Sequence, residues 1–173
     1  MRKITLGIVC MTIMSIQSFS QSTYSKAIGI RLSGSYYDIA SVSYKFFISE
    51  AGAIELNGGF GARNYSHTGG HYGAFALSAA ASYQHHFDIK PVEGLRWFIG
   101  GGAIVYNVFS DDDQYEGFAF GLFPTGGVDY KFDNIPLNLS ADLRPTFFLA
   151  MPNYYSTFQG TFGIAARYTI GQR

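Results

Sequence analysis

The side chains used in hydrolysis and metal binding are concentrated in two polar stretches, residues 66–73 (SHTGGHYG) and residues 110–117 (SDDDQYEG). A serine hydrolase needs a hydroxyl, an imidazole that accepts its proton and a carboxylate that orients the imidazole. The candidates for these roles are Ser66 and His67 with His71 nearby, His85 and His86 near another turn, and an acidic loop residue such as Asp112. No spacing fixes their relative positions, so the pattern favours polar loops over a catalytic site, and we expect no enzymatic activity.

The same stretches contain the imidazoles and carboxylates that metal ions bind. Neither has the spacing of an EF-hand loop or of a zinc site, so we predict no metal and no cofactor. The other two histidines, His85 and His86, lie near a different turn. We treat the loop residues as candidates for binding an external ligand or surface: His67, His71, Asp111, Asp112, Asp113, Tyr115, Tyr154 and Tyr155.

A second group of charged residues lies within apolar stretches. Residues 137–151 (LNLSADLRPTFFLAM) contain Asp142 and Arg144 near their middle. Apolar residues occupy every second position there, so the two charges share the opposite face of a strand. Similar stretches recur along the chain, and their charges share the polar face in the same way: Arg31, Lys45, Glu55, Arg63, Arg96, Asp129, Lys131, Asp142, Arg144 and Arg167.

This two-residue period predicts an all-β protein of about eight strands, each about ten residues long or longer. The predicted strands are residues 27–37, 39–49, 53–65, 73–87, 95–109, 118–132, 137–151 and 159–170. An even number of strands of this length favours a closed antiparallel up-and-down barrel that spans a membrane, because a bilayer cannot satisfy an open sheet edge. Residues 21–173 would form this single barrel domain.

The first twenty residues have the features of a secretory signal peptide. Arg2 and Lys3 precede an apolar run at residues 4–16, and small residues follow at Ser18 and Ser20. The run is too short to span a membrane as a helix. Cys10, the only cysteine, lies within it, so the mature chain would have no disulfide and no thiolate ligand.

Composition favours a barrel with its apolar face outward. Charged residues are 14%, against about 25% in a typical soluble domain. The formal net charge is zero, which gives no indication of nucleic-acid binding. The polar face is rich in small residues, and aromatic residues gather near the strand ends, as at the two surfaces of a membrane. One predicted band is Tyr36, Tyr37, Tyr65, Tyr72, Tyr106, Tyr154 and Tyr155, and the other is Tyr83, Phe87, Trp97, Tyr130, Phe132 and Tyr168.

Connection lengths predict an orientation, since such barrels have short periplasmic turns and longer outer loops. The short connections are residues 49–52, 88–94 and 133–136, and the long ones are residues 64–73, 110–117 and 151–160. The first outer connection, near Tyr37 and Asp38, is unusually short.

An eight-strand barrel is just wide enough for side chains to fill, so we predict a filled lumen without a pore. Hairpin geometry predicts that its charges tie adjacent strands together. Seven cations face three carboxylates, and the excess would contact water, polar side chains or carbonyl groups; the alternative is a hydrated lumen that attracts anions. The predicted neighbours are Arg144 with Arg167 and Asp142, Lys45 with Glu55 and Arg31, and Arg96 with Lys131 and Asp129. Arg31 on the first strand would join Arg144 and Asp142, so that Asp142 bridges two or three guanidinium groups.

The sequence resembles the small eight-stranded outer-membrane β-barrel proteins, which include the OmpX- and OmpW-type barrels. The resemblance rests on the signal peptide, the strand count, residues 139–149 (LSADLRPTFFL) and the closing residues 162–170 (FGIAARYTI). Gly171, Gln172 and Arg173 follow where a terminal aromatic residue is common, and Gln21 is similar to the start of Bacteroidetes secreted proteins. The resemblance implies a monomer in the cell outer membrane, inserted by the barrel-assembly machinery and surrounded by outer-membrane lipid.

For function, the resemblance implies a structural role, or a binding or adhesive role through the extracellular loops. A lipid A-modifying enzyme, either a deacylase or an acyltransferase, is one alternative. A narrow pore is the other.

Overall fold

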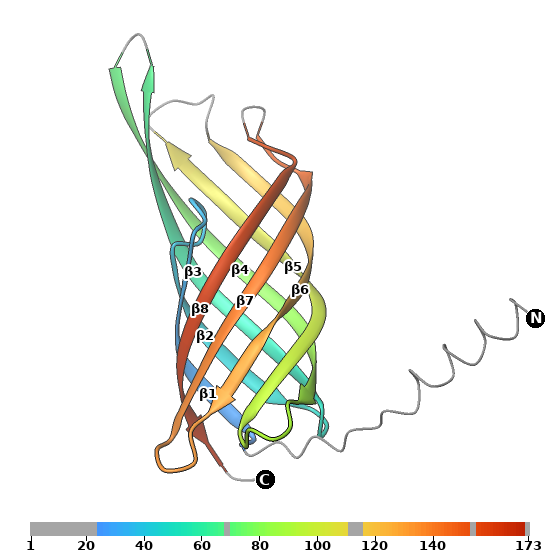
Figure 1. Ribbon diagram of the computed structural model, residues 1–173. Coiled ribbons are helices and arrows are strands. Elements are labelled where there is room, and N and C mark those ends of the chain that lie inside the picture. The colour runs from blue at the N-terminus through green and yellow to red at the C-terminus, as the bar shows by residue number, and fades with distance from the viewer. Residues whose placement is uncertain (1–23, 68–69, 111–115, 153–154, 172–173) are drawn as a thin grey trace, which may run out of the picture.

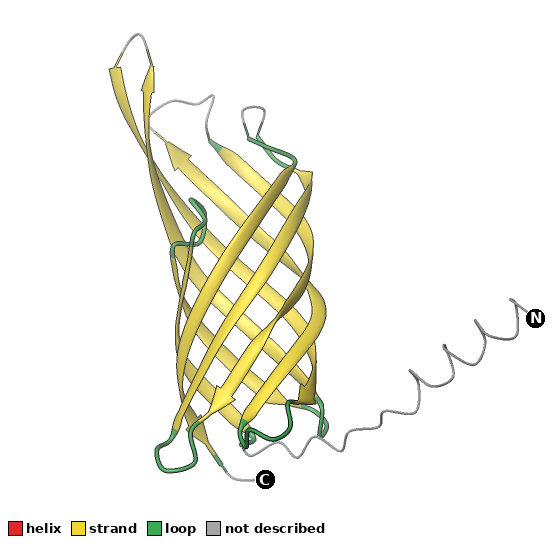
Figure 2. Ribbon diagram, viewed as in Figure 1, coloured by secondary structure: helices red, strands yellow, loops and turns green. Residues whose placement is uncertain are grey.

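The computed structural model describes residues 24–67, 70–110, 116–152 and 155–171, and for residues 65–67 and 70–72 it describes the backbone alone. The predicted signal peptide, residues 1–20, lies outside these ranges. The described residues form strands and loops (Figure 2). No helix among them is long and apolar enough to cross a membrane.

Eight strands form one closed barrel in which each strand pairs antiparallel with the next and the last pairs with the first (Figure 1). The predicted fold class is therefore confirmed. The strands are β1 (Lys26–Ser33), β2 (Ala40–Phe47), β3 (Gly52–His67), β4 (Gly70–Asp88), β5 (Leu95–Ser110), β6 (Gly117–Lys131), β7 (Leu137–Ala150) and β8 (Phe158–Ile170).

The two ends of the barrel differ in their connections. At one end, which we call the turn end, residues 48–51, 89–94 and 132–136 join the strands near the C-terminus (Figure 1). At the loop end, the connections are residues 34–39, 68–69, 111–116 and 151–157. The β3–β4 hairpin extends furthest at the loop end, whereas the dark-blue β1–β2 hairpin stops well below its neighbours (Figure 1).

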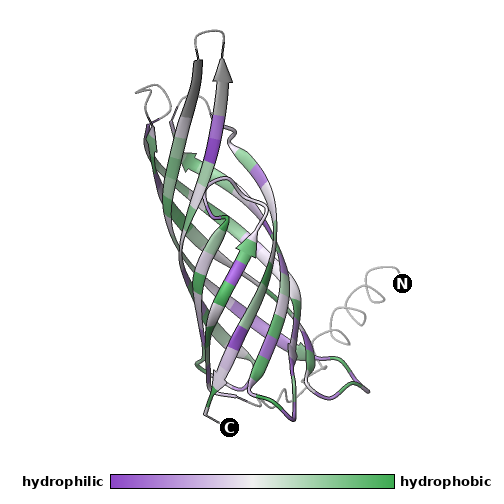
Figure 3. Ribbon diagram, turned by 90° about the vertical axis from the view of Figure 1, so that its left-hand side faces the viewer, coloured by the Kyte–Doolittle hydropathy of each residue, from purple (hydrophilic) through white to green (hydrophobic). Residues whose placement is uncertain are grey.

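The strands alternate in burial with the two-residue period that the sequence predicts. Leu149 is 67% exposed and Ile30 is 60% exposed on the outer surface, whereas Lys45 and Arg167 are fully buried inside. Hydrophobic and hydrophilic residues alternate in colour along the strands (Figure 3). The barrel is thus the inverse of a soluble protein, with its apolar side chains outside and its charges inside.

Buried aromatic side chains lie inside the barrel near both ends. At the loop end, Tyr37, Tyr106 and Phe148 lie in one buried cluster, and at the turn end Tyr24 and Phe47 lie in another. The assignment of Tyr37 and Tyr106 to an outer aromatic band was wrong, because both rings point into the lumen. The rings of Tyr83, Trp97 and Tyr168 do lie on the outer surface.

Two connections differ from their predicted form. β1 ends at Ser33 rather than at Tyr37, because residues 34–39 leave the wall and turn into the barrel, where Tyr37 and Asp38 are buried. The predicted long loop at residues 64–73 is largely paired strand, since the β3–β4 ladder continues to His67 and Gly70.

Candidate functional site

The most concentrated set of functional groups is a line of charges of alternating sign across the lumen. Arg31 donates two hydrogen bonds to the carboxylate of Asp142, from Nε at 3.1 Å and from Nη2 at 2.8 Å. Its Nη1 donates to Asp38 at 3.1 Å. Glu55 lies 2.7 Å from Arg144 and 3.0 Å from Arg167. We call the six residues the ion chain, in the order Asp38, Arg31, Asp142, Arg144, Glu55 and Arg167.

The link between the two halves of the ion chain is electrostatic. Nε of Arg144 is 2.8 Å from Oδ1 of Asp142, but the contact lacks hydrogen-bond geometry. The contact between Nη2 of Arg167 and Glu55 is of the same kind. Arg167 also donates from Nε to Ser43 at 2.8 Å and from Nη1 to Ser140 at 2.7 Å. The ion chain therefore contains three cations and three carboxylates, and its net charge is zero.

A second set of charges, the Asp129 cluster, lies nearer the turn end. The buried carboxylate of Asp129 is 3.2 Å from Nζ of Lys45 and 3.0 Å from Nη2 of Arg96. Asn138 donates to it at 2.9 Å, and the hydroxyl of Tyr24 lies at 3.4 Å. One carboxylate thus serves two cations from different strands.

Asp142 contacts both Arg31 and Arg144, as predicted, but several other charges pair across the lumen rather than between adjacent strands. Asp142 on β7 binds Arg31 on β1, and Arg144 binds Glu55 on β3. Arg144 lies opposite Thr161 in the β7–β8 ladder, so it is not the register neighbour of Arg167. The two guanidinium groups share Glu55 instead.

The other predicted neighbours are placed as follows. Lys45 is opposite Glu55 in the β2–β3 ladder, but its ion pair is with Asp129. Arg96 contacts Asp129 as the register indicates. Lys131 instead donates to the carbonyl groups of Phe132 and Ile135 at the turn end.

The charge balance of the lumen differs from the predicted seven cations and three carboxylates. Asp38, which sequence analysis left out, is a fourth interior carboxylate. Arg63 lies at the loop end with its side chain exposed, its guanidinium 5.3 Å from the centre of the Tyr36 ring. Without Arg63 and Lys131, the two networks contain five cations and four carboxylates, so little excess charge remains to attract anions.

Glycines make room for these inward groups. The inner face of Gly163 is covered by the guanidinium of Arg31, and a Cβ there would collide with it. Gly61 is approached by the backbone of Tyr36, and Gly59 by the carboxylate of Asp38. The glycines on β3 are the one signal in the sequence that a loop enters the barrel beside that strand.

Three aromatic rings pack together inside the barrel near its loop end. Tyr37 and Tyr106 stack in parallel with their ring centres 4.6 Å apart, and Phe148 packs edge-on against both at 5.5 Å. We call these three residues the mouth plug. Tyr36 lies over it, and its hydroxyl is 3.3 Å from that of Tyr106.

Most of the predicted loop candidates lie outside the described residues. These are Asp111, Asp112, Asp113, Tyr115 and Tyr154, together with the side chains of Ser66, His67 and His71. Tyr155 is described, and its ring stacks on Tyr36 at 5.4 Å. Within the described ranges, no three histidine, cysteine or acidic side chains form a group able to hold a metal ion.

The histidines near the turn end occupy different surroundings. The ring of His86 is buried between Phe47 and Phe98, and its Nδ1 is 3.3 Å from the carbonyl oxygen of Ala51. His85 lies on the other face of β4, with Nδ1 3.3 Å from the hydroxyl of Tyr83. The two side chains therefore do not form one site.

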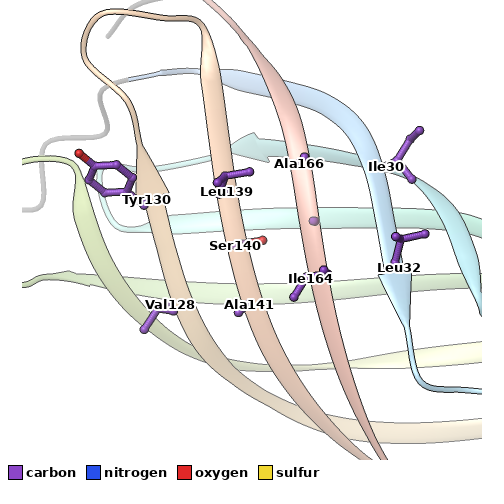
Figure 4. A pocket seen from close by; sticks show the side chains of 10 residues that line it. Ile30, Leu32, Val128, Tyr130, Leu139, Ser140, Ala141, Ile164 and Ala166 are labelled. Carbon is purple, nitrogen blue, oxygen red and sulfur yellow. The ribbon is translucent and has the colours of Figure 1, made fainter.

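An apolar groove with a volume of about 620 Å³ lies on the outer wall over β6, β7, β8 and β1 (Figure 4). Ala141 and Ala166 form its floor, and Leu139, Ile164 and Ile30 rise beside them (Figure 4). These side chains are on the outer face of the barrel, so the groove is separate from the lumen.

Comparison with solved structures finds barrels of the same kind. The N-terminal β-barrel domain of OprF from Pseudomonas aeruginosa matches with a TM-score of 0.54 and 19% identity, over 87% of this chain and 100% of that domain. The chain has the fold of a small outer-membrane β-barrel.

Two further solved structures match with lower scores. Neisserial surface protein A matches with a TM-score of 0.46 and 15% identity, over 85% of this chain and 96% of its own. Ail, the attachment invasion locus protein of Yersinia pestis, matches with a TM-score of 0.44 and 13% identity, over 87% and 99%. No protein-family model matches the sequence, and no curated protein matches it significantly.

Proposed function

We propose that the protein is an integral outer-membrane barrel with a closed, structural lumen, and that it acts by binding a ligand or surface at its loop end. The inverted burial supports the location most directly. Large apolar side chains such as Leu149, Leu143 and Ile30 are more than half exposed, and water would disfavour that surface. Acyl chains would cover it at no such cost, including the groove over Ala141 and Ala166.

The lumen supports a structural rather than a conducting role. Both ends are closed by aromatic rings, at the loop end by the mouth plug and at the turn end by Tyr24 and Phe47. Between them, the ion chain and the Asp129 cluster place buried charges in contact with one another. Paired charges of this kind fix the relative positions of the strands.

The loop end supports the binding role. The β3–β4 hairpin extends beyond the rest of the barrel (Figure 1). Tyr36 and Tyr155 stack on each other there, and the guanidinium of Arg63 lies 5.3 Å from the centre of the Tyr36 ring. Aromatic and arginine side chains are enriched where proteins bind partners.

Cell fractionation and heat-modifiable migration on gels test the location, and we expect an outer-membrane fraction with two gel mobilities. Planar-bilayer recordings test the closed lumen. Wild-type protein should give no steady conductance, and neither should Tyr37→Ala combined with Tyr106→Ala, because the ion chain and the turn-end rings of Tyr24 and Phe47 remain in the lumen. Steady conductance by the wild type would favour the narrow pore, and altered acyl chains on lipid A in its presence would favour the enzyme.

A further inference from the structure

The barrel wall has a notch at the loop end, because β1 and β2 are shorter than the strands on either side. The β2–β3 ladder ends at Ala40 opposite Phe60, whereas β3 continues to His67. The β1–β8 ladder ends at Ser33 opposite Gly163, whereas β8 begins at Phe158. Both neighbours therefore extend beyond the hairpin between them (Figures 1 and 3).

The 34–39 loop closes the floor of the notch. The amide of Ile39 donates to the carbonyl oxygen of Phe60 on β3 at 2.8 Å, and the amide of Gly34 donates to Phe162 on β8 at 3.1 Å. Beyond these two bonds, no described residue pairs with the facing edge of either strand. β3 and β8 are separated here by the width of two missing strands. Their facing edges are therefore three strand spacings apart, or about 14 Å at about 4.8 Å per spacing.

Backbone groups on both edges point into this notch. Alternate residues of an antiparallel strand direct their N–H and C=O groups to the same side. Phe60 bonds toward β2, so Ala62, Asn64 and Ser66 direct theirs into the notch on the β3 side. On the β8 side, Phe162 bonds toward β1, so Gly160 and Phe158 do the same.

We propose that the β3 side of the notch binds an extended segment of a partner protein, which pairs with residues 62–66 as an added strand. This deepens the proposed binding role by naming the partner class. An extended peptide offers donors and acceptors at the repeat that an edge strand needs. A lipid acyl chain has neither. The β3 edge presents three residues and is held on its other side by β4, whereas β8 presents two.

The surroundings of the edge select the side chains of the partner. Arg63 and Tyr36 lie on the inner side of β3, so an added strand would place an acidic or polar residue toward them. On the outer side, the rings of Phe60 and Phe75 stack with centres 6.1 Å apart. An apolar residue of the partner would pack beside them. The preferred segment therefore alternates polar and apolar residues.

The experiment measures amide hydrogen exchange by NMR in phosphatidylcholine nanodiscs. The probe is a short synthetic peptide of alternating threonine and valine with one central aspartate. We expect it to slow exchange at Ala62 and Asn64 at least tenfold, while Arg63, already paired with Ala74 in the β4 ladder, changes little. The same peptide methylated at every backbone nitrogen should have no effect.

Two variants identify the edge. Asn64→Pro removes an N–H that points into the notch on β3, and Gly160→Pro does so on β8. We expect Asn64→Pro to weaken peptide binding about tenfold, and Gly160→Pro to leave it unchanged. The reverse result would overturn the assignment to β3.

Three other outcomes overturn the proposal. These are no slowing at Ala62 and Asn64, equal slowing by the methylated peptide, and slowing without peptide that increases with protein concentration, which would identify a second copy of the chain as the occupant. None of them bears on the closed lumen, because conductance tests that part of the proposed function separately.

Discussion

The two charge networks in the lumen hold their cations with different amounts of support. In the ion chain, Arg31 and Arg144 each contact two carboxylates, and Arg167 contacts one but also donates to Ser43 and Ser140. In the Asp129 cluster, Lys45 and Arg96 both depend on one. The loss of one carboxylate should therefore be most harmful in the Asp129 cluster and least harmful at the end of the ion chain.

The largest effect is expected for Asp129→Asn. It leaves Lys45 and Arg96 buried with no ion-pair partner among the described residues. Breaking a buried pair from one side costs about 3–5 kcal/mol, because the remaining charge is uncompensated. We expect a loss of that size in the free energy of unfolding, measured in urea with lipid vesicles through the fluorescence of Trp97, the only tryptophan.

Two controls accompany this variant. Asp133→Asn removes an exposed carboxylate from the turn at residues 132–136 and should change the unfolding free energy by less than about 0.5 kcal/mol. Lys45→Met combined with Asp129→Asn removes one of the two unpaired cations and places an apolar side chain beside Phe98. The double variant should therefore recover part of the lost free energy of unfolding. An Asp129→Asn protein of wild-type stability would show that the cluster does not hold the barrel.

A smaller effect is expected for Glu55→Gln in the middle of the ion chain. Arg144 keeps Asp142 at 2.8 Å, and Arg167 keeps its bonds to Ser43 and Ser140. We expect a loss of about 2 kcal/mol, the value of a charge-assisted hydrogen bond or two, in the same urea measurement. A loss larger than that of Asp129→Asn would contradict the difference between the two networks.

The sequence predicted the wall of the barrel better than its contents. A strict two-residue period fixes which side chains share a face, so it placed Arg31, Lys45 and Asp142 inside and Ile30 and Leu143 outside. It predicted the contact of Arg96 with Asp129 and that of Asp142 with Arg144, but not the pairs across the barrel, because long arginine and lysine side chains cross the lumen. Register neighbours on the wall, such as Lys45 and Glu55, therefore need not be each other's ion pairs.

The inward loop was missed for a related reason. The predicted strand at residues 27–37 ran through Tyr37 and left Asp38 in a very short connection, because nothing in the local pattern marks a loop that turns inward. The loop leaves the wall because Asp38 finds Arg31 inside, and because Gly59 and Gly61 leave space on the inner face of β3. Both reasons depend on contacts between strands that the local sequence does not specify.

The smallest effect is expected for Asp38→Asn, at the end of the ion chain. Arg31 would keep both of its hydrogen bonds to Asp142, and an asparagine oxygen could still accept from Nη1. We expect a loss of about 1 kcal/mol in the urea measurement, near the value of one ordinary hydrogen bond. Asp142→Asn weakens two hydrogen bonds to Arg31 and the contact with Arg144, so it should lower the free energy of unfolding by more than Asp38→Asn does. If Asp38→Asn instead lowered the free energy of unfolding as much as Glu55→Gln, the 34–39 loop would contribute as much to the ion chain as the strands do. The predicted order of the three losses would then be wrong.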